Sequence, residues 1–251
     1  MAEPEAEKPI EEIQESKAET TSPPTRRYRT YLFQFMLVAT TSAFALLTFL
    51  VKTTPSFPID LAVTQSIQSI DFPFFDELMI VISWPGFLPQ SLLLPAAILL
   101  MIYGLGLHWE TVAGSIAALL PALINLLVKE IIQRPRPTVD LVEVFRILTS
   151  YSFPSGHVMF YVGFFGFLGF LSFTLMKRSW RRMVLITICS IFILLVGVSR
   201  INLGQHWASD VLGAYLLGSL LLVGIIQFYR WGKQRFFVHQ PVAPETAESG
   251  E

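Results

Sequence analysis

Long apolar stretches alternate with short polar segments along most of this chain. Because a helix needs roughly 20 apolar residues to cross a bilayer, the pattern predicts about six membrane-spanning helices. We expect them near Tyr31–Val51, Leu88–Leu107, Thr111–Ile132, His157–Met176, Met183–Val198 and Val211–Phe228. The fifth of these stretches is short, so we expect it to extend at either end.

The residues between the first two spans follow a mixed pattern. Phe57–Gly86 carries apolar side chains at spacings that favour short amphipathic helices near the membrane interface. Pro95 and Pro121 fall inside predicted spans and are expected to kink them. A glycine at every third position from Gly163 to Gly169 indicates close helix packing. The predicted fold class is all-α, an integral membrane helical bundle with about six transmembrane helices plus short interfacial helices between the first and second.

Composition supports a membrane protein with polar tails. Of the 251 residues, 53% are hydrophobic and 15% are charged, which is too apolar for an ordinary soluble domain. We expect an acidic, disordered N-terminal tail at 1–29, a membrane-embedded domain at 30–230 and a polar C-terminal tail at 231–251. No clustered basic face points to a nucleic-acid partner. The single cysteine, Cys189, excludes an intrachain disulfide and is expected to be a packing residue.

The positions of the basic residues predict the orientation. They cluster before the first span, between the fourth and fifth, and after the sixth: Arg26, Arg27, Arg29, Lys177, Arg178, Arg181, Arg182, Arg230, Lys233 and Arg235. With six spans all of these clusters fall on one side, which the positive-inside rule assigns to the cytoplasm. We therefore expect a multi-pass cell membrane protein with both tails cytoplasmic.

Three polar segments lie at the ends of apolar stretches, all on the predicted extracytoplasmic side. They are Lys129–Pro137 (K-E-I-I-Q-R-P-R-P), Pro154–His157 (P-S-G-H) and Ser199–Asp210 (S-R-I-N-L-G-Q-H-W-A-S-D). Charge beside a bilayer is costly, so a cluster of it indicates a functional site. The combination of cations and imidazoles suits an anion, and phosphate in particular.

Lys129, Arg136 and Arg200 are the candidate phosphate-binding cations. Arginine matches two oxygens of a phosphate monoester at once, and lysine adds a point charge. Arg134 could share this work or simply meet solvent or lipid headgroups. Any one of these cations alone would also fit a side chain that reaches to the membrane interface.

Two histidines supply the candidate chemistry. His206 and Asp210 are four residues apart, so on a helix the carboxylate can fix the tautomer of the imidazole and leave its other nitrogen free to attack. An alternative reading is a capping aspartate beside an interfacial histidine. His157 has no acidic neighbour in sequence and suits a general acid. Ser155 is a natural N-cap and Gly156 allows close approach of a ligand, although this tetrapeptide alone also fits a plain helix start.

Other polar residues are weaker candidates. No D-x-D or H-E-x-x-H pattern offers a metal site, so we expect no obligatory metal and no cofactor. His108 and His239 are assigned to the surface. Glu130 points elsewhere on its helix than Lys129, and the remaining acids near the motifs lie in the loop before the second one.

The three motif segments together resemble the signature of the type 2 phosphatidic acid phosphatase superfamily. The pattern is K-x6-R-P, then P-S-G-H, then S-R-x5-H-x3-D, and every position is filled here. The resemblance covers about residues 57–230. Soluble relatives in this superfamily include vanadium-dependent haloperoxidases and bacterial acid phosphatases, but six spans favour a lipid phosphate as substrate.

The resemblance implies a mechanism. His206 would attack phosphorus to form a phosphohistidine, Asp210 would orient it, and His157 would protonate the leaving group. The phosphoryl oxygens would be held by Lys129, Arg136, Ser155, Gly156 and Arg200. The membrane domain would then be a metal-independent lipid phosphatase domain with its active site near the outer leaflet.

Two other functions fit the same residues. A lipid phosphotransferase would share the phosphohistidine and use another acceptor in place of water. A transporter or lipid-binding protein would need only the anion site, but would not need a paired histidine and carboxylate. The expected partners are a lipid phosphate and membrane lipids. The sequence does not distinguish phosphatidic acid, phosphatidylglycerol phosphate and polyprenyl diphosphate, and it does not indicate an oligomeric state.

Overall fold

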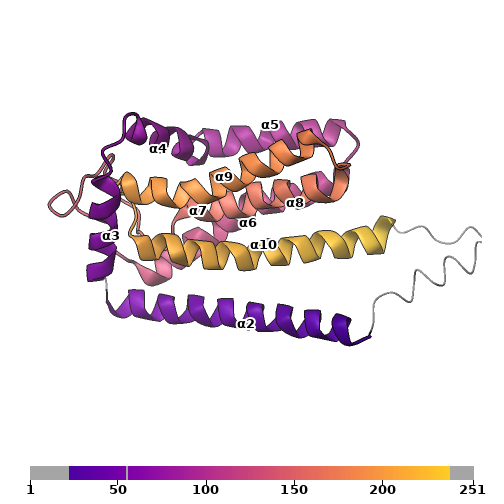
Figure 1. The fold of residues 1–251 in the computed structure, drawn as a ribbon, viewed down its shortest axis with the longest axis horizontal. Coiled ribbons are helices and arrows are strands. Elements are labelled where there is room, and N and C mark those ends of the chain that lie inside the picture. Colours follow the sequence, from indigo (N-terminus) through magenta and orange to yellow (C-terminus); the bar gives the residue numbers. More distant parts are fainter. Residues whose placement is uncertain (1–22, 55, 238–251) are drawn as a thin grey trace, which may run out of the picture. The chain divides into compact units, whose positions relative to one another are not determined.

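Helices make up all of the regular structure in residues 23–54 and 56–237, which the computed structural model describes (Figure 1). In chain order they are α2 (Pro23–Thr53), α3 (Pro58–Gln68), α4 (Phe75–Ser83), η1 (Trp84–Gly86), α5 (Gln90–Gly104), α6 (His108–Ile132), α7 (Gly156–Phe160), η2 (Tyr161–Phe165), α8 (Gly166–Leu175), α9 (Trp180–Asn202) and α10 (Ala208–Phe237). Within these ranges, 5 helical stretches are long and apolar enough to cross a membrane, and a bent helix pair supplies a further candidate. The predicted all-α membrane bundle is confirmed.

The chain divides into two compact units that meet between Ser42 and Ala43. The first unit holds the start of α2, where the apolar residues of the first predicted span follow Arg27 and Arg29. The second unit holds the end of α2 and every other described helix. All three polar motif segments therefore belong to the second unit.

The second predicted span belongs to a bent pair of helices. Phe75–Gly86, which was expected at the interface, and Gln90–Gly104 are together long and apolar enough to cross a membrane. A bend of 62° lies between them, so the pair is either a broken span or a re-entrant loop. Pro85 and Pro89 explain the break, because proline lacks the N–H donor that would continue the helix. Of the expected interfacial helices, α3 lies across the end of the bundle, where it contacts α9 and α10 (Figure 1).

The remaining spans match the prediction and extend it slightly. The short fifth stretch lengthens at both ends into α9. The sixth, α10, runs on to Phe237, into the segment predicted as tail. The rest of that tail and residues 1–22 lie outside the described residues. Pro95 and Pro121 lie inside α5 and α6, and both helices are continuous through them.

The fourth span is the most buried of the candidate spans, with 56% of its apolar window inside the protein. It consists of α7, the π-helical turn η2 and α8 in unbroken succession. A Cβ added to Gly163 would lie 2.6 Å from Cγ of Pro121, so glycine allows α6 to approach closely at this point. The glycine spacing in this span therefore reflects helix packing, as predicted.

The end of α6 directs the chain towards the polar segments. Gln133 caps the helix in the left-handed region, with φ of 56°, and Pro135 follows, which cannot continue the helix. The Lys52 side chain donates from Nζ to the carbonyl oxygens of Ile131 at 2.8 Å and Ile132 at 3.2 Å. These bonds satisfy carbonyl groups that the helix end leaves without partners.

The connection from α6 to α7 folds back over the end of the bundle. Gly204, in the turn between α9 and α10, has φ of +60°, and a Cβ there would collide with the carbonyl of Glu143. Next to it, the Phe145 N–H donates to the carbonyl of Leu203 at 3.1 Å. The glycine therefore allows this long loop to lie directly on the turn that carries the third motif.

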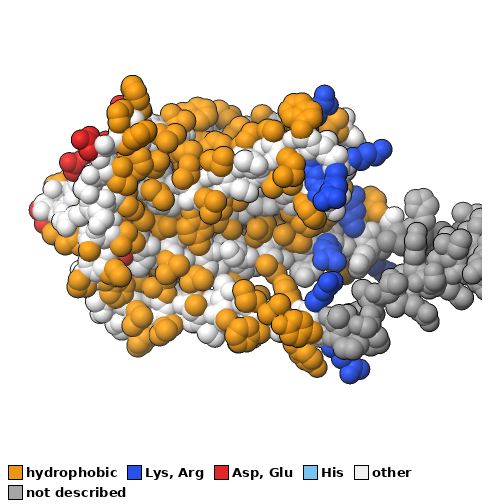
Figure 2. All heavy atoms as spheres, viewed as in Figure 1, with side chains coloured by type: hydrophobic (Ala, Val, Ile, Leu, Met, Phe, Trp, Pro, Cys, Tyr) orange, Lys and Arg blue, Asp and Glu red, His pale blue; other side chains and the backbone are white. Residues whose placement is uncertain are grey.

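The other end of the second unit is basic. Figure 2 shows lysine and arginine side chains gathered there, at the ends of α9 and α10, and the exposed ones include Lys177, Arg178, Arg181, Arg230 and Arg235. Glu110 is buried at this end, where it pairs with Lys233 Nζ at 2.6 Å and accepts from Tyr229 Oη at 2.9 Å. The polar motif segments lie at the opposite end of the long helices.

Candidate active site

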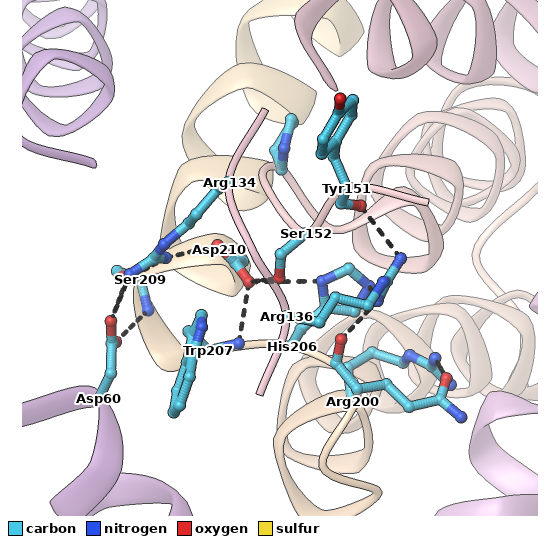
Figure 3. Close-up of polar contacts among 12 residues, drawn as sticks. Asp60, Arg134, Arg136, Tyr151, Ser152, Arg200, His206, Trp207, Ser209 and Asp210 are labelled. Carbon is cyan, nitrogen blue, oxygen red and sulfur yellow. Dashed lines mark hydrogen bonds and ion pairs between the residues drawn. The ribbon is translucent and has the colours of Figure 1, made fainter. Parts of the chain in front are cut away.

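The predicted site residues come from separate helix ends and meet at one end of the bundle (Figure 3). The last turns of α6 and α9 supply Lys129 and Arg200, and the start of α10 supplies Asp210. Ser155 is the N-cap of α7, and Gly156 and His157 open that helix. Arg136 lies in the loop after α6 and His206 in the turn before α10.

His206 and Asp210 form the centre of the site. Nδ1 of His206 lies 3.5 Å from Oδ2 of Asp210, and both side chains are buried. The same carboxylate oxygen accepts the backbone N–H of Trp207 at 2.9 Å and the hydroxyl of Ser152. Asp210 thus combines both predicted alternatives, since it faces the imidazole and also caps the first turn of α10. With Nδ1 facing the carboxylate, Nε2 is the nitrogen left for chemistry.

Buried cations surround the other nitrogen of His206. Nη1 of Arg136 lies 3.3 Å from His206 Nε2. Burial, together with the positive charges of Arg136, Lys129 and Arg200, holds the pKa of His206 well below its ordinary range. The imidazole is therefore neutral near pH 7, which is the form that can act as a nucleophile.

Lys129 and Arg136 converge on one carbonyl oxygen. Lys129 Nζ donates to the Tyr151 carbonyl at 2.7 Å, and Arg136 Nη2 donates to it at 3.1 Å. Arg136 also donates to the carbonyls of Ser150 at 2.7 Å and Gln205 at 2.5 Å. Burial lowers the pKa of Arg136 and the charge of Asp210 opposes that shift. Backbone contacts thus hold both cations beside the candidate nucleophile, His206.

Arg200 lies on the other side of the site. Its Nη1 donates to Ser83 Oγ at 3.0 Å, and its Nη2 donates to the side-chain oxygen of Gln205. The Phe87 ring links it to His157, because the guanidinium lies 5.3 Å from that ring's centroid and the imidazole packs edge-on against it at 4.9 Å. The two imidazoles are close enough to interact electrostatically.

Several buried polar atoms in the site have no protein partner. They are Ser155 Oγ, His157 Nε2, Arg200 Nε and Gln205 Nε2. Ser155 occupies the predicted N-cap position, but its hydroxyl makes no cap bond. Because buried polar groups are nearly always hydrogen-bonded in folded proteins, such a cluster indicates a polar ligand.

Sequence reasoning missed three residues that complete the site, Asp60, Ser152 and Gln205, and left the role of Arg134 open. Asp60 is fully buried, and its carboxylate pairs with Arg134, which in turn pairs with Asp210. Ser152 and Gln205 touch Asp210 and Arg200, as described above. Arg134 meets neither solvent nor headgroups, since only 1% of it is exposed. An acidic residue on an apolar amphipathic helix was the one available signal for Asp60.

The weaker sequence candidates lie elsewhere. Glu130, Asp140 and Glu143 are exposed. His108 packs edge-on against Tyr103 at the opposite end of the bundle, with ring centroids 4.6 Å apart. His239 lies outside the described residues. Within residues 23–54 and 56–237 no group of three or more His, Cys, Asp or Glu side chains is arranged to hold a metal ion.

An apolar cavity of about 540 Å³ opens beside the site, between α5 and α6. His157 and Gly156 form its polar end, and Asn125 lies next to them. Its remaining walls include Leu92, Leu99, Ala118 and Ala122. The space therefore runs from the candidate catalytic histidine along helices that cross the membrane.

Comparison with known proteins gives one consistent family. The model of the PAP2 superfamily matches residues 109–234. A phosphatidylglycerophosphatase B from Bacillus subtilis is 32% identical over 171 residues, which are 64% of this chain and 79% of the relative. Another, from Haemophilus influenzae, is 34% identical over 90 residues, 36% of each chain.

Solved structures agree in fold. The crystal structure of a transmembrane PAP2-type phosphatidylglycerolphosphate phosphatase from Bacillus subtilis superimposes with a TM-score of 0.68 at 28% identity, over 78% of this chain and 96% of that one. Aquifex aeolicus LpxE superimposes with a TM-score of 0.55 at 19% identity, over 69% and 98% of the two chains. The second likeness extends to the fold alone.

Proposed function

The chain belongs to the PAP2 superfamily and is a membrane lipid phosphatase, and we propose that it removes the terminal phosphate of phosphatidylglycerophosphate through a phosphohistidine. The observation that carries this proposal is a cluster of two imidazoles and several cations beside an apolar cavity that His157 lines. The relatives named above favour this lipid over phosphatidic acid and polyprenyl diphosphate.

The charge of the cluster suits a phosphate monoester. The cluster holds four cations, Lys129, Arg134, Arg136 and Arg200, and two carboxylates, Asp60 and Asp210. With all six of these groups charged and both histidines neutral, two positive charges are left over. A phosphate monoester approaches two negative charges at neutral pH, because its second pKa is about 6. Bound substrate would neutralise the site, which favours a terminal phosphate over a singly charged phosphodiester.

In the first step, Nε2 of His206 attacks phosphorus as the bond from phosphorus to the lipid oxygen breaks. The bound substrate dianion favours protonated His157, which donates its proton to that oxygen, so the lipid leaves as an alcohol. The positive charge that develops on His206 is stabilised by Asp210. Lys129, Arg136 and Arg200, with the Ser155 hydroxyl and the Gly156 backbone, hold the phosphoryl oxygens during transfer.

In the second step, water replaces the histidine on phosphorus. His157 is now neutral and takes a proton from the water as it attacks, and inorganic phosphate leaves. His206 returns to its neutral form. No single contact supplies the necessary rate, since one hydrogen bond between charged groups is worth about 1.5–3 kcal/mol and phosphate monoester hydrolysis can be accelerated by up to ~10²¹-fold. The covalent route and the cluster of cations act together.

The orientation follows from charge. We assign the basic ends of α9 and α10 to the cytoplasm and the site to the extracytoplasmic side. The polar site at the end of the helices and the apolar cavity beside it then match a lipid whose head lies at the membrane surface and whose tails lie in the hydrocarbon. Both tails of the chain are cytoplasmic in this arrangement.

The test is release of inorganic phosphate by the purified protein in detergent. Phosphatidylglycerophosphate, phosphatidic acid and a polyprenyl diphosphate are compared, each with His206→Ala as control. We expect the first lipid to be turned over fastest and the chelator EDTA to leave the rate unchanged. Faster turnover of another lipid would reassign the substrate, loss of activity with EDTA would contradict the metal-free mechanism, and transfer to an added alcohol without phosphate release would indicate a phosphotransferase.

A further inference from the structure

A chain of buried charges runs from α3 to the nucleophile (Figure 3). Oδ2 of Asp60 lies 2.7 Å from Nη2 of Arg134, and Nη1 of the same guanidinium lies 2.5 Å from Oδ1 of Asp210. The other oxygen of Asp210 faces Nδ1 of His206. The order along this chain is therefore carboxylate, guanidinium, carboxylate and imidazole.

Further bonds fix the chain in one geometry. Ser209 donates its backbone N–H to Oδ1 of Asp60 at 2.8 Å and its hydroxyl to Oδ2 at 2.6 Å. The same hydroxyl accepts from Arg134 Nη1 at 2.7 Å. The Phe57 ring covers the guanidinium, with its centroid 5.5 Å away. Arg134 is thus held in one plane, with one nitrogen towards each carboxylate.

Ion pairs this deep are poor stabilisers, because removing charges from water costs about as much as their attraction returns. A hydrophobic contact between α3 and α10 would hold these helices together as well. The buried chain is better explained by its far end, where the charge on Asp210 determines how readily His206 binds a proton.

We propose that Asp60 and Arg134 are positioning residues that orient Asp210 and, through it, set the proton affinity of His206. The positive charge of Arg134 partly offsets the negative charge that Asp210 presents to the imidazole, and the negative charge of Asp60 partly offsets that of Arg134. The balance leaves enough negative charge on Asp210 to stabilise the phosphohistidine, but not enough to protonate His206 before it attacks. This inference rests on the proposed phosphatase function and deepens it.

The groups that face His206 come from every neighbouring element. They are Asp210 from α10, Lys129 from α6, Arg200 from α9, His157 from α7 and Arg136 from the loop after α6. Substitutions at Asp60 and Arg134 replace none of these groups. Any effect on the titration of His206 must then come from a change in Asp210 or from the altered charges at positions 60 and 134.

The two substitutions should shift the pH profile in opposite directions. Asp60→Asn leaves the charge of Arg134 unopposed, so protonated His206 is disfavoured and the acidic limb of kcat/KM moves to lower pH. Arg134→Gln removes that positive charge, so protonation is favoured and the acidic limb moves to higher pH. We expect each shift to reach up to about one pH unit and kcat to fall roughly tenfold or more.

The experiment measures kcat/KM against pH for the full-length protein in detergent, with the lipid that the wild type turns over. Asp71→Asn, at an exposed position after α3, is the matched control and should keep the wild-type profile. The variant that combines Asp60→Asn with Arg134→Gln should return the acidic limb towards its wild-type position. Inhibition by inorganic phosphate should change less than kcat, because neither residue contacts the phosphoryl oxygens.

Opposite shifts would support the inference. Two results would overturn the inference: reduced activity with an unshifted acidic limb of the pH profile, or shifts of both variants in the same direction. Either would show that the buried charges only hold the helices together. If Asp60→Asn does not fold, Ser209→Ala is the alternative variant, since it removes only the hydroxyl that Asp60 and Arg134 share. An unshifted acidic limb in Ser209→Ala would also overturn the inference. A wild type without phosphatase activity would remove the proposed function and this inference together, whereas an active wild type with unshifted variants would remove the inference alone.

Discussion

Gly86 lies directly against the imidazole of His157. A Cβ added to this glycine would come within 2.9 Å of both Cγ and Nε2 of that ring, closer than real Cβ atoms come to other atoms. Gly86 ends η1 at the bend between Phe75–Gly86 and Gln90–Gly104, so the break between two helices lies where the candidate general acid needs room. The bend and the histidine are therefore parts of one arrangement.

Gly86→Ala should displace the His157 ring and lower kcat more than it changes KM. A shift of about 1 Å in a catalytic group can cost about 100-fold, so we expect a loss between roughly 10- and 100-fold. Steady-state kinetics on the lipid substrate measure it. Gly104→Ala, where a Cβ meets nothing within 4 Å, should behave as wild type, and equal kinetics for both variants would contradict the close contact.

His206→Ala should abolish turnover, whereas Lys129→Ala should leave a measurable remnant. The first removes the atom that is proposed to bond to phosphorus. The second removes one charged contact worth about 1.5–3 kcal/mol, which corresponds to a loss of roughly 10- to 150-fold. Quenching with a ³²P-labelled substrate should trap a phosphoenzyme in the wild type and none in His206→Ala. Equal residual rates in the two variants would refute the assigned nucleophile.

Ala122→Phe should narrow the apolar cavity between α5 and α6, because Ala122 lines it. We expect KM for a long-chain lipid to rise about tenfold, while hydrolysis of a short, soluble phosphate ester changes little. Leu123→Phe is the matched control, since Leu123 is 56% exposed and is not among the cavity residues. An equal effect on both substrates would mean that the cavity does not hold the lipid tails.

Stability should fall as the pH drops below about 6.5, in part because of His206. The usual pKa of histidine is about 6.5, and that of His206 is lower in the folded protein. At a pH between those two values, the unfolded chain binds more protons than the folded one. The contribution of His206 to the free energy of unfolding is therefore fully present above this pH range and is lost as the pH falls through it. Thermal unfolding at about pH 7.5 and about pH 5 measures it. His206→Gln should show a smaller drop, and an unchanged drop would argue against a buried neutral imidazole.

Glu110→Gln should weaken the opposite end of the bundle without affecting catalysis. Glu110 is 1% exposed and holds both Lys233 and Tyr229, so it joins the start of α6 to α10. We expect a loss of about 1.5–3 kcal/mol in the free energy of unfolding, the usual worth of hydrogen bonds to a charged group. Thermal unfolding measures this loss, and kcat should stay at the wild-type value. A large fall in kcat would show that the two ends are coupled.

The sequence predicted the long helices because length and hydropathy alone decide whether a segment can cross a bilayer. The bend between Phe75–Gly86 and Gln90–Gly104 was not predicted for the same reason. Length and hydropathy are read for each stretch separately, whereas the packing of α4 against α9 and the bend into α5 depend on tertiary structure.

The motif residues were predictable because their types and spacings carry chemistry by themselves. Asp60 was not, because its partner Arg134 is 74 positions away in sequence. For Arg134 the sequence left open whether it binds phosphate or meets solvent or headgroups, because its partners Asp60 and Asp210 are 74 and 76 positions away. Tertiary packing decides the role of both residues, and the roles of the motif residues themselves await the substitutions described above.

The π-helical turn at Tyr161–Phe165 contains one residue more than an α-helical turn would need. One residue corresponds to about 100° of rotation around the axis of an α-helix. Deleting a residue from this turn would leave a span of ordinary hydropathy, but it would rotate α7 by that angle relative to α8. The direction of the His157 side chain thus depends on the number of residues in the turn. An insertion or deletion here should therefore be far less tolerated than an exchange of one apolar side chain for another.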